Sequence, residues 1–247
     1  MKKTVSLGVG YLLLSLMSYA QDSTMAISKN KYIQVDLGIG YLHTNMGSIN
    51  TSLKNFNYRP IKDNYTTLSF AATYFVNRFL FRTEVSMILP NHVDQPDNIK
   101  TSFSGYTVSA GIGYAVIQKP HFRLYPYAGI NSFNSYLKLA DLSPVENMNE
   151  LVNTPHRNAK IQFSNASLDL GVQLERIINV RNNKWDCPQN NKYMTVGARL
   201  GYNWSPGTVK ARYNGNQLSG APEYNFQGPY IKLVVGTGTK IRELKWK

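Results

Sequence analysis

The segment IQVDLGIGY, residues 33–41, alternates apolar residues with glycine or polar residues at every step. Two further segments repeat this pattern, VSAGIGYAV at residues 108–116 and ASLDLGVQLE at residues 166–175. A period of two places alternate side chains on opposite faces of a β-strand. These segments therefore predict strands that have one face in an apolar medium.

The glycine-rich opposite face indicates which medium that is. Glycine weakens a strand interior, and a face open to water has no steric need for it. Glycine mixed with charge suits the inside of a narrow closed barrel, where side chains crowd. The apolar face then points outward, into lipid.

The whole chain of 247 residues reads as eight such strands. We expect them at residues 32–42, 65–76, 79–88, 103–117, 122–136, 161–178, 192–204 and 228–241. Most reach the roughly 9–11 residues that a tilted strand needs to cross a membrane. The predicted fold is all-β, an eight-stranded antiparallel transmembrane β-barrel. Pro126 removes a ladder donor inside its strand, so a bulge or a later strand start is expected there.

The predicted connections alternate between short and long. The shorter ones are 76–79, 118–121 and 179–191, and the long ones are 43–64, 90–102, 137–160 and 205–227. Outer-membrane barrels have this asymmetry, with short periplasmic turns and long outer loops.

The N-terminus predicts export. Lys2 and Lys3 precede an apolar run at 5–17 and the small-residue end Ser18-Tyr19-Ala20, which is typical of a signal peptide. We expect a signal peptide over 1–20 and one barrel domain over 21–247. The run is too short for a membrane-spanning helix, and the mean hydropathy of −0.32 is compatible with a barrel. The predicted location is the outer membrane.

The polar face places charges of both signs in the lumen. The charged residues expected there are Asp36, Arg82, Glu84, Asp169, Glu175, Arg199 and Lys232. Buried charges must pair, or each costs several kcal/mol. The set predicts either a salt-bridged plug or a narrow ion path or proton relay. We favour the plug, because eight strands leave little room for water.

Candidate catalytic residues fall in the outer connections without forming a motif. They are His43, His92, His156, Ser48, Ser52, Ser102, Ser143, Asp94 and Glu146. Their spacing links no nucleophile to a base, and zinc-type spacing is absent. The G-x-G segments at 38–40 and 111–113 precede no predicted helix, which disfavours a dinucleotide site. We therefore expect no enzyme, no cofactor and no metal.

The formal net charge of +13 would suit nucleic acid, but export of the chain disfavours that partner. Lysine and arginine gather at the periplasmic strand ends, where they attract anionic headgroups or an acidic partner, or simply anchor the barrel. Cys187 is the one cysteine, so it pairs with another chain or remains a free thiol.

Aromatic residues near the strand ends predict interfacial girdles. They are Tyr32, Tyr41, Tyr65, Phe79, Phe81, Phe103, Phe122, Tyr136, Phe163, Tyr193, Tyr202, Trp204 and Tyr230.

The leader ending Ala20-Gln21, the strand Val35-Asp36-Leu37-Gly38-Ile39-Gly40-Tyr41 and the segment Gly111-Ile112-Gly113-Tyr114 resemble the small outer-membrane β-barrel proteins of Bacteroidota often labelled PorT-like. The resemblance covers the chain after the leader. It implies an outer-membrane location and, in some members, accessory roles in protein secretion. It offers no catalytic motif.

The leading hypothesis is a non-enzymatic structural or accessory protein that contacts outer-membrane lipid and presents loops to a protein partner. The alternatives are a lipid A- or peptide-modifying barrel enzyme, a narrow passive pore, and a lipocalin-like binder with an apolar interior.

Overall fold

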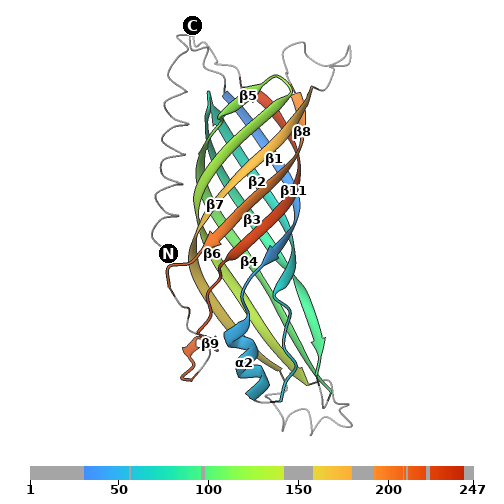
Figure 1. Cartoon of the computed structure of the whole chain (residues 1–247), viewed down its shortest axis with the longest axis vertical. Helices are drawn as coiled ribbons and strands as arrows, with labels where there is room; N and C mark the ends of the chain where they lie inside the picture. The colour runs from blue at the N-terminus through green and yellow to red at the C-terminus, as the bar shows by residue number, and fades with distance from the viewer. Residues whose placement is uncertain are drawn as a thin grey trace, which may run out of the picture.

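Eight long strands close into a single antiparallel barrel in the computed structural model (Figure 1). The structure describes residues 31–55, 57–95, 98–141, 158–179, 192–207, 209, 211–220 and 223–241. The predicted signal peptide, Cys187, His156, Ser143 and Glu146 lie outside these residues. No helix among the described residues is long and apolar enough to cross a membrane.

The strands of the ring lie side by side in chain order, and the last strand pairs with the first. The strands of the ring are β1 (Lys31–His43), β2 (Asn64–Val76), β3 (Phe79–Asp94), β4 (Ile99–Tyr114), β6 (Phe122–Asp141), β7 (Asn158–Asn179), β8 (Lys192–Trp204) and β11 (Gly228–Ile241). Strand β11 pairs with β1 from Tyr230↔Leu42 to Ile241↔Lys31, which closes the barrel. The predicted fold class is confirmed.

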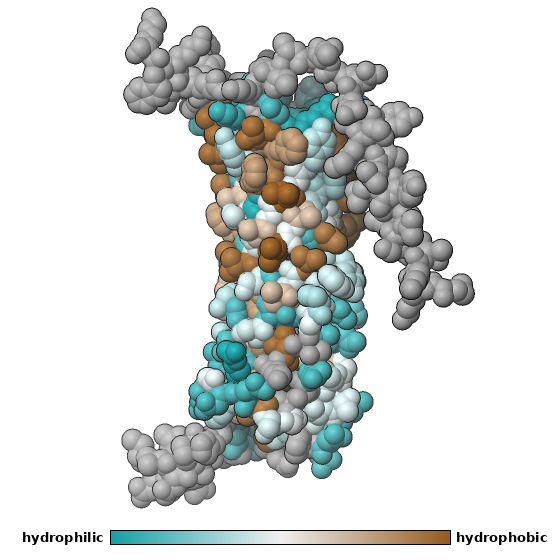
Figure 2. Space-filling view, turned by 90° about the vertical axis from the view of Figure 1, so that its left-hand side faces the viewer, coloured by the Kyte–Doolittle hydropathy of each residue, from teal (hydrophilic) through white to brown (hydrophobic). Residues whose placement is uncertain are grey.

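The outer face of all eight strands carries large apolar side chains in an exposed belt. Leu37, Ile130 and Leu233 are 65%, 66% and 62% exposed, although apolar groups of this size are normally buried. Figure 2 shows apolar side chains, in brown, gathered on the half of the barrel nearest the described chain ends. A closed barrel with such a belt satisfies its backbone internally and is suited to lipid. A lipocalin-like protein would have the opposite polarity.

Strands β3, β4, β6 and β7 continue beyond the belt, on the side of the long connections (Figure 1). The expected loop at 90–102 is wrong, because β3 runs to Asp94 and β4 begins at Ile99. Likewise β6 continues to Asp141 and β7 begins at Asn158. The polarity reverses here: Phe103 points inward and is buried, whereas His92 is exposed. A search for apolar residues on the outer face therefore stops too early.

The outer connections also contain structure that the strand pattern did not predict. Helix α2 (Gly47–Asn55) lies at the outer end and buries Ile49 and Leu53. Strands β9 (Arg212–Tyr213) and β10 (Asn216–Gln217) form a hairpin that extends the sheet from β7.

Pro126 lies opposite a bulge, one of the two arrangements expected for it. Gly113 pairs with Tyr127, and Ile117 of the short strand β5 (Ile117–Lys119) pairs with Leu124. Three residues, 114–116, therefore face the two residues 125 and 126. The missing Pro126 donor falls where the ladder is already interrupted.

The aromatic residues predicted to form girdles divide into an exposed and a buried group. Tyr41, Phe79, Phe81, Tyr202 and Trp204 are exposed on the outer face. A second group is buried instead, and a girdle role for its members is wrong: Tyr65, Phe103, Phe163, Tyr193 and Tyr230. These five fill the interior.

Candidate functional site: the charged lumen

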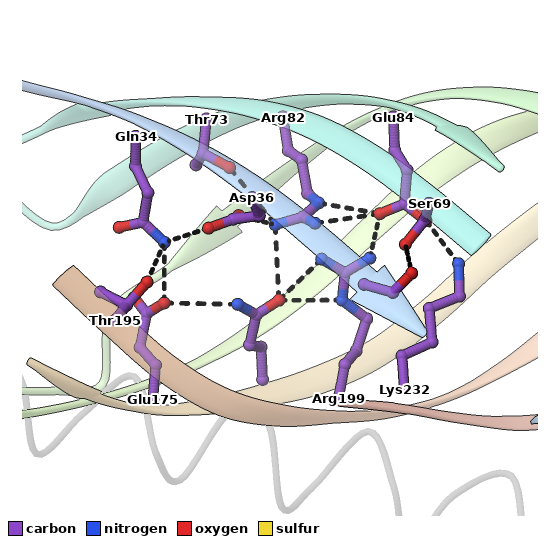
Figure 3. Close-up of polar contacts among 12 residues, drawn as sticks. Gln34, Asp36, Ser69, Thr73, Arg82, Glu84, Glu175, Thr195, Arg199 and Lys232 are labelled. Carbon is purple, nitrogen blue, oxygen red and sulfur yellow. Dashed lines mark hydrogen bonds and ion pairs between the residues drawn. The ribbon is translucent and has the colours of Figure 1, made fainter. Parts of the chain in front are cut away.

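The lumen contains the seven charged residues that the alternation places on the inner face. They come from five strands: Asp36 from β1, Arg82 and Glu84 from β3, Asp169 and Glu175 from β7, Arg199 from β8 and Lys232 from β11. Figure 3 shows most of them as one connected layer of polar contacts. Arg199 and Glu175 are each 1% exposed, so the middle of this layer is buried.

Glu84 is the centre of the layer, since three cations meet its carboxylate. Arg82 Nη2 and Nε lie 2.9 Å and 3.2 Å from Glu84 Oε2. Arg199 Nη1 pairs with the same oxygen, and Lys232 Nζ pairs with Oε1. Ser86 Oγ donates to Oε1 at 2.8 Å. Charge-assisted bonds of this kind are the strong ones.

Gln173 connects the two central arginines. Its Oε1 accepts from Arg199 Nε at 2.8 Å and from Arg199 Nη2 at 2.7 Å. Arg82 Nη1 reaches the same oxygen at 3.4 Å and Asp36 Oδ2 at 3.1 Å. An amide carbonyl thus satisfies guanidinium donors without adding charge.

Toward the short turns the layer ends on a third carboxylate, Glu175. Glu175 Oε1 pairs with Arg123 Nη1 at 2.9 Å, and Glu175 Oε2 accepts from Gln34 Nε2 at 2.9 Å. Arg123 was absent from the predicted lumen set. Arg123 is the second residue of β6, and the alternating pattern becomes clear only after it, so the pattern does not identify it. It nevertheless shares the inner face with Tyr125 and Tyr127. Its guanidinium carbon lies 4.0 Å from the Phe75 ring centroid.

Asp169 differs from the other carboxylates. It accepts a hydrogen bond from Tyr230 Oη at 2.5 Å, and Tyr230 in turn contacts Tyr127 through the two hydroxyls. Among the described residues, no arginine or lysine forms an ion pair with it.

The described lumen balances its charges. Four cations, Arg82, Arg123, Arg199 and Lys232, face four carboxylates, Asp36, Glu84, Asp169 and Glu175. Each buried ion would cost several kcal/mol if left without a partner. The arrangement is therefore a cross-linking layer that joins opposite walls of the barrel.

The space left in this region is small. A cavity of about 20 Å³ lies between the charged layer and the outer end, lined by residues that include Glu84, Asp169 and Lys232. That volume holds about one water molecule. A chain of waters needed for an ion path does not fit into it.

An apolar cluster fills the outer end of the lumen. It joins α2 to the connection before β11 and to the strand walls, and consists of Leu42, Met46, Ile49, Leu53, Ile61, Tyr65, Ile88, Phe103, Phe133, Leu137, Phe163, Val209, Ala211, Tyr224, Phe226 and Tyr230. Phe133 and Phe226 stack with centroids 3.6 Å apart. Tyr224 shares a 3.0 Å hydrogen bond with Thr44, and burial raises the pKa of the Tyr224 hydroxyl.

The candidate catalytic residues do not form a site in the described structure. His43 Nδ1 contacts Asn64 Oδ1 at 2.8 Å. His92 and Ser102 are partners in the β3–β4 register, but no hydrogen bond is found between their side chains. Ser48 donates to the Glu223 carbonyl at 2.5 Å. The described residues also contain no group of three metal-ligating side chains.

Comparisons with known proteins return small outer-membrane barrels. No protein-family model and no curated protein matches the chain. Among solved structures, Neisserial surface protein A shares 16% identity, with a TM-score of 0.41, over 85% of this chain and 97% of its own. Ail of Yersinia pestis shares 12% identity, with a TM-score of 0.42, over 86% and 99%.

A major outer membrane protein of Thermus thermophilus shares 13% identity, with a TM-score of 0.46, over 85% of this chain and 99% of its own. The outer membrane protease OmpT of Escherichia coli is also similar, at 8% identity and a TM-score of 0.38, over 90% and 99%. These proteins differ in role, and none is similar enough to assign one to this chain.

Proposed function

We propose that this protein is a non-conducting, non-enzymatic outer-membrane barrel that acts as a structural or accessory protein and presents its outer end to a partner. In this proposal, residues 1–20 direct export and are removed before Gln21. The short turns face the periplasm, and the long connections face outward.

The filled lumen carries the proposal. The charged layer, the cavity of about 20 Å³ and the apolar cluster lie one after another along the barrel. A pore needs a continuous wet path, and an enzyme needs an open site that a substrate can enter. Neither requirement fits an interior closed in this way, so the outer surface is the part available for function.

The outer end has the properties of a presentation platform. The extended ends of β3, β4, β6 and β7 form a sheet beyond the belt, with polar residues outward. Helix α2 and the β9–β10 hairpin are packed or paired onto this end, which fixes their positions. Binding residues often lie on connections held by such a rigid scaffold. The PorT-like resemblance suggests a secretion complex as the setting.

Photo-crosslinking tests the proposal. A photoreactive amino acid replaces Asn214, which is exposed in the β9–β10 turn, or Leu233, which is exposed in the belt. After irradiation of intact cells, mass spectrometry of the purified barrel identifies attached chains.

We expect one protein to crosslink from Asn214 and to co-purify in near-stoichiometric amount, whereas Leu233 should not capture it. A barrel that purifies alone and captures nothing from Asn214 would contradict the proposed role. Cell fractionation tests the location separately, since the proposal requires the chain in the outer membrane.

A further inference from the structure

A polar groove lies where the connection that carries the β9–β10 hairpin meets β6 and β7, just beyond the apolar belt. The groove has a volume of about 480 Å³ and is lined by Ser132, Ser164, Asn165, Ala166, Val209, Arg212 and Gln217. This volume lies within the usual range for ligand sites. Its described lining carries the cation Arg212 and no carboxylate.

Two exposed lysines extend the groove outward. Lys138 of β6 and Lys160 of β7 are partners in the strand register and share the outer face. Like charges directly opposite each other destabilise a sheet, so an anionic partner would relieve this pair. Lys160 Nζ lies 3.9 Å from the Tyr136 ring centroid. Tyr136 is opposite Gln162, which is opposite Arg212, so the lysine pair and the groove are contiguous.

The surface on the membrane side of the groove is apolar. Ser132 and Ala166 are the next outward residues after Ile130 and Leu168 of the belt. Two residues of strand correspond to about 7 Å. An apolar hollow of about 710 Å³ in the belt also reaches Ile130 and is bordered by small residues that include Ala110 and Ala128.

From this order of surfaces we infer that the groove binds the phosphorylated saccharide headgroup of an outer-leaflet glycolipid. The acyl chains lie against the belt, the sugar hydroxyls face serine, asparagine and glutamine side chains, and the phosphates face Arg212, Lys138 and Lys160. Basic side chains at a membrane surface bind anionic headgroups in this way. The membrane-bound form is favoured over a free polyanion because the groove opens directly above the belt. The inference rests on the proposed outer-membrane location.

Native mass spectrometry of the purified full-length chain in detergent tests the inference. The probes are lipid A with both phosphates, the same glycolipid without phosphates, and a soluble sulfated oligosaccharide as competitor. The double variant Lys138→Gln/Lys160→Gln is compared with Lys54→Gln/Lys62→Gln, which removes the same charge from exposed positions of the outer connection before β2. Arg212→Gln is a single-site test on the hairpin.

We expect phosphorylated lipid A to bind at least about tenfold more tightly than the dephosphorylated form. Lys138→Gln/Lys160→Gln and Arg212→Gln should each weaken that binding, the double variant by about tenfold, and Lys54→Gln/Lys62→Gln should change it less than about twofold. Circular dichroism verifies folding. If the double variant does not fold, Arg212→Gln decides the outcome.

Three results would overturn the inference. The two double variants could lose equal affinity for phosphorylated lipid A, or both forms of lipid A could bind equally well. The soluble oligosaccharide could also displace bound phosphorylated lipid A as effectively as added lipid A does. None of these depends on crosslinking from Asn214, so failure of the glycolipid site and failure of the partner role can be told apart.

Discussion

Glu84 is the residue on which the charged layer depends most. It meets Arg82, Arg199 and Lys232, so its removal leaves three buried cations with one carboxylate fewer. We predict that Glu84→Gln lowers the free energy of unfolding by about 3–5 kcal/mol, the usual cost of breaking a buried ion pair. Urea unfolding in lipid vesicles measures it.

The matched control is Glu223→Gln, the same chemical change at an exposed position before Tyr224. It should alter stability by less than about 0.5 kcal/mol. Equal effects of the two substitutions would mean that the lumen charges do not hold the barrel together.

The inner glycines make room for tyrosines of the neighbouring strand, as Gly201 of β8 does for its register partner Tyr230 of β11. A Cβ at Gly201 would overlap Tyr230 Oη and would lie 2.9 Å from the Leu170 carbonyl oxygen. We predict that Gly201→Ala destabilises the barrel by about 1–3 kcal/mol through overpacking. Gly207→Ala, where nothing lies within 4 Å of the added Cβ, should be nearly neutral in the same unfolding assay. A neutral Gly201→Ala would contradict the packing account.

The sequence alone assigns single residues to the inner face of the barrel, but it does not predict which of them are in contact. Alternation assigned Asp36, Glu84 and Arg199 to the inner face, because the period of two is a local property. The contact of Gln34 with Glu175 joins β1 to β7, and such a contact depends on how the ring closes. Arg123 was missed because the apolar pattern of β6 is clear only further along the strand.

At the scale of elements, the membrane explains both the successes and the errors. Inside the belt, each strand has apolar residues outward, and all eight strands were predicted there. Outside the belt, β3 and β4 reverse polarity, so the same pattern predicts loop at residues 90–94 and 99–102, which are strand. Helix α2 has its own signal, since Met46, Ile49 and Leu53 are spaced for one helical face and all are buried.

The belt itself can be tested on β11. Leu233 is 62% exposed on the outer face, and a charge there would have to enter hydrocarbon. We predict that Leu233→Lys lowers the stability of the barrel folded into vesicles by about 2–4 kcal/mol. Ser219→Lys, in an exposed outer connection, should have little effect. If both variants fold equally well, the apolar face does not contact lipid.

At the scale of the whole molecule, the lumen is filled in successive layers. Phe75, Leu80, Ala115 and Tyr125 cluster near the short turns. The charged layer follows, and the large apolar cluster closes the outer end. Each layer joins strands that are not neighbours in the ring. In the part of the chain that the structure describes, these layers support the outer surface of the barrel, whose polar outward face is visible in Figure 2.

The most direct test of this closed lumen is the conductance of the purified full-length chain in a planar lipid bilayer. Folding and insertion are verified by circular dichroism and by flotation with vesicles. We predict no steady conductance, because the space in the lumen beside Glu84 and Lys232, about 20 Å³, holds about one water molecule. Reproducible ohmic channels from the wild-type chain would contradict the account and identify the protein as a pore.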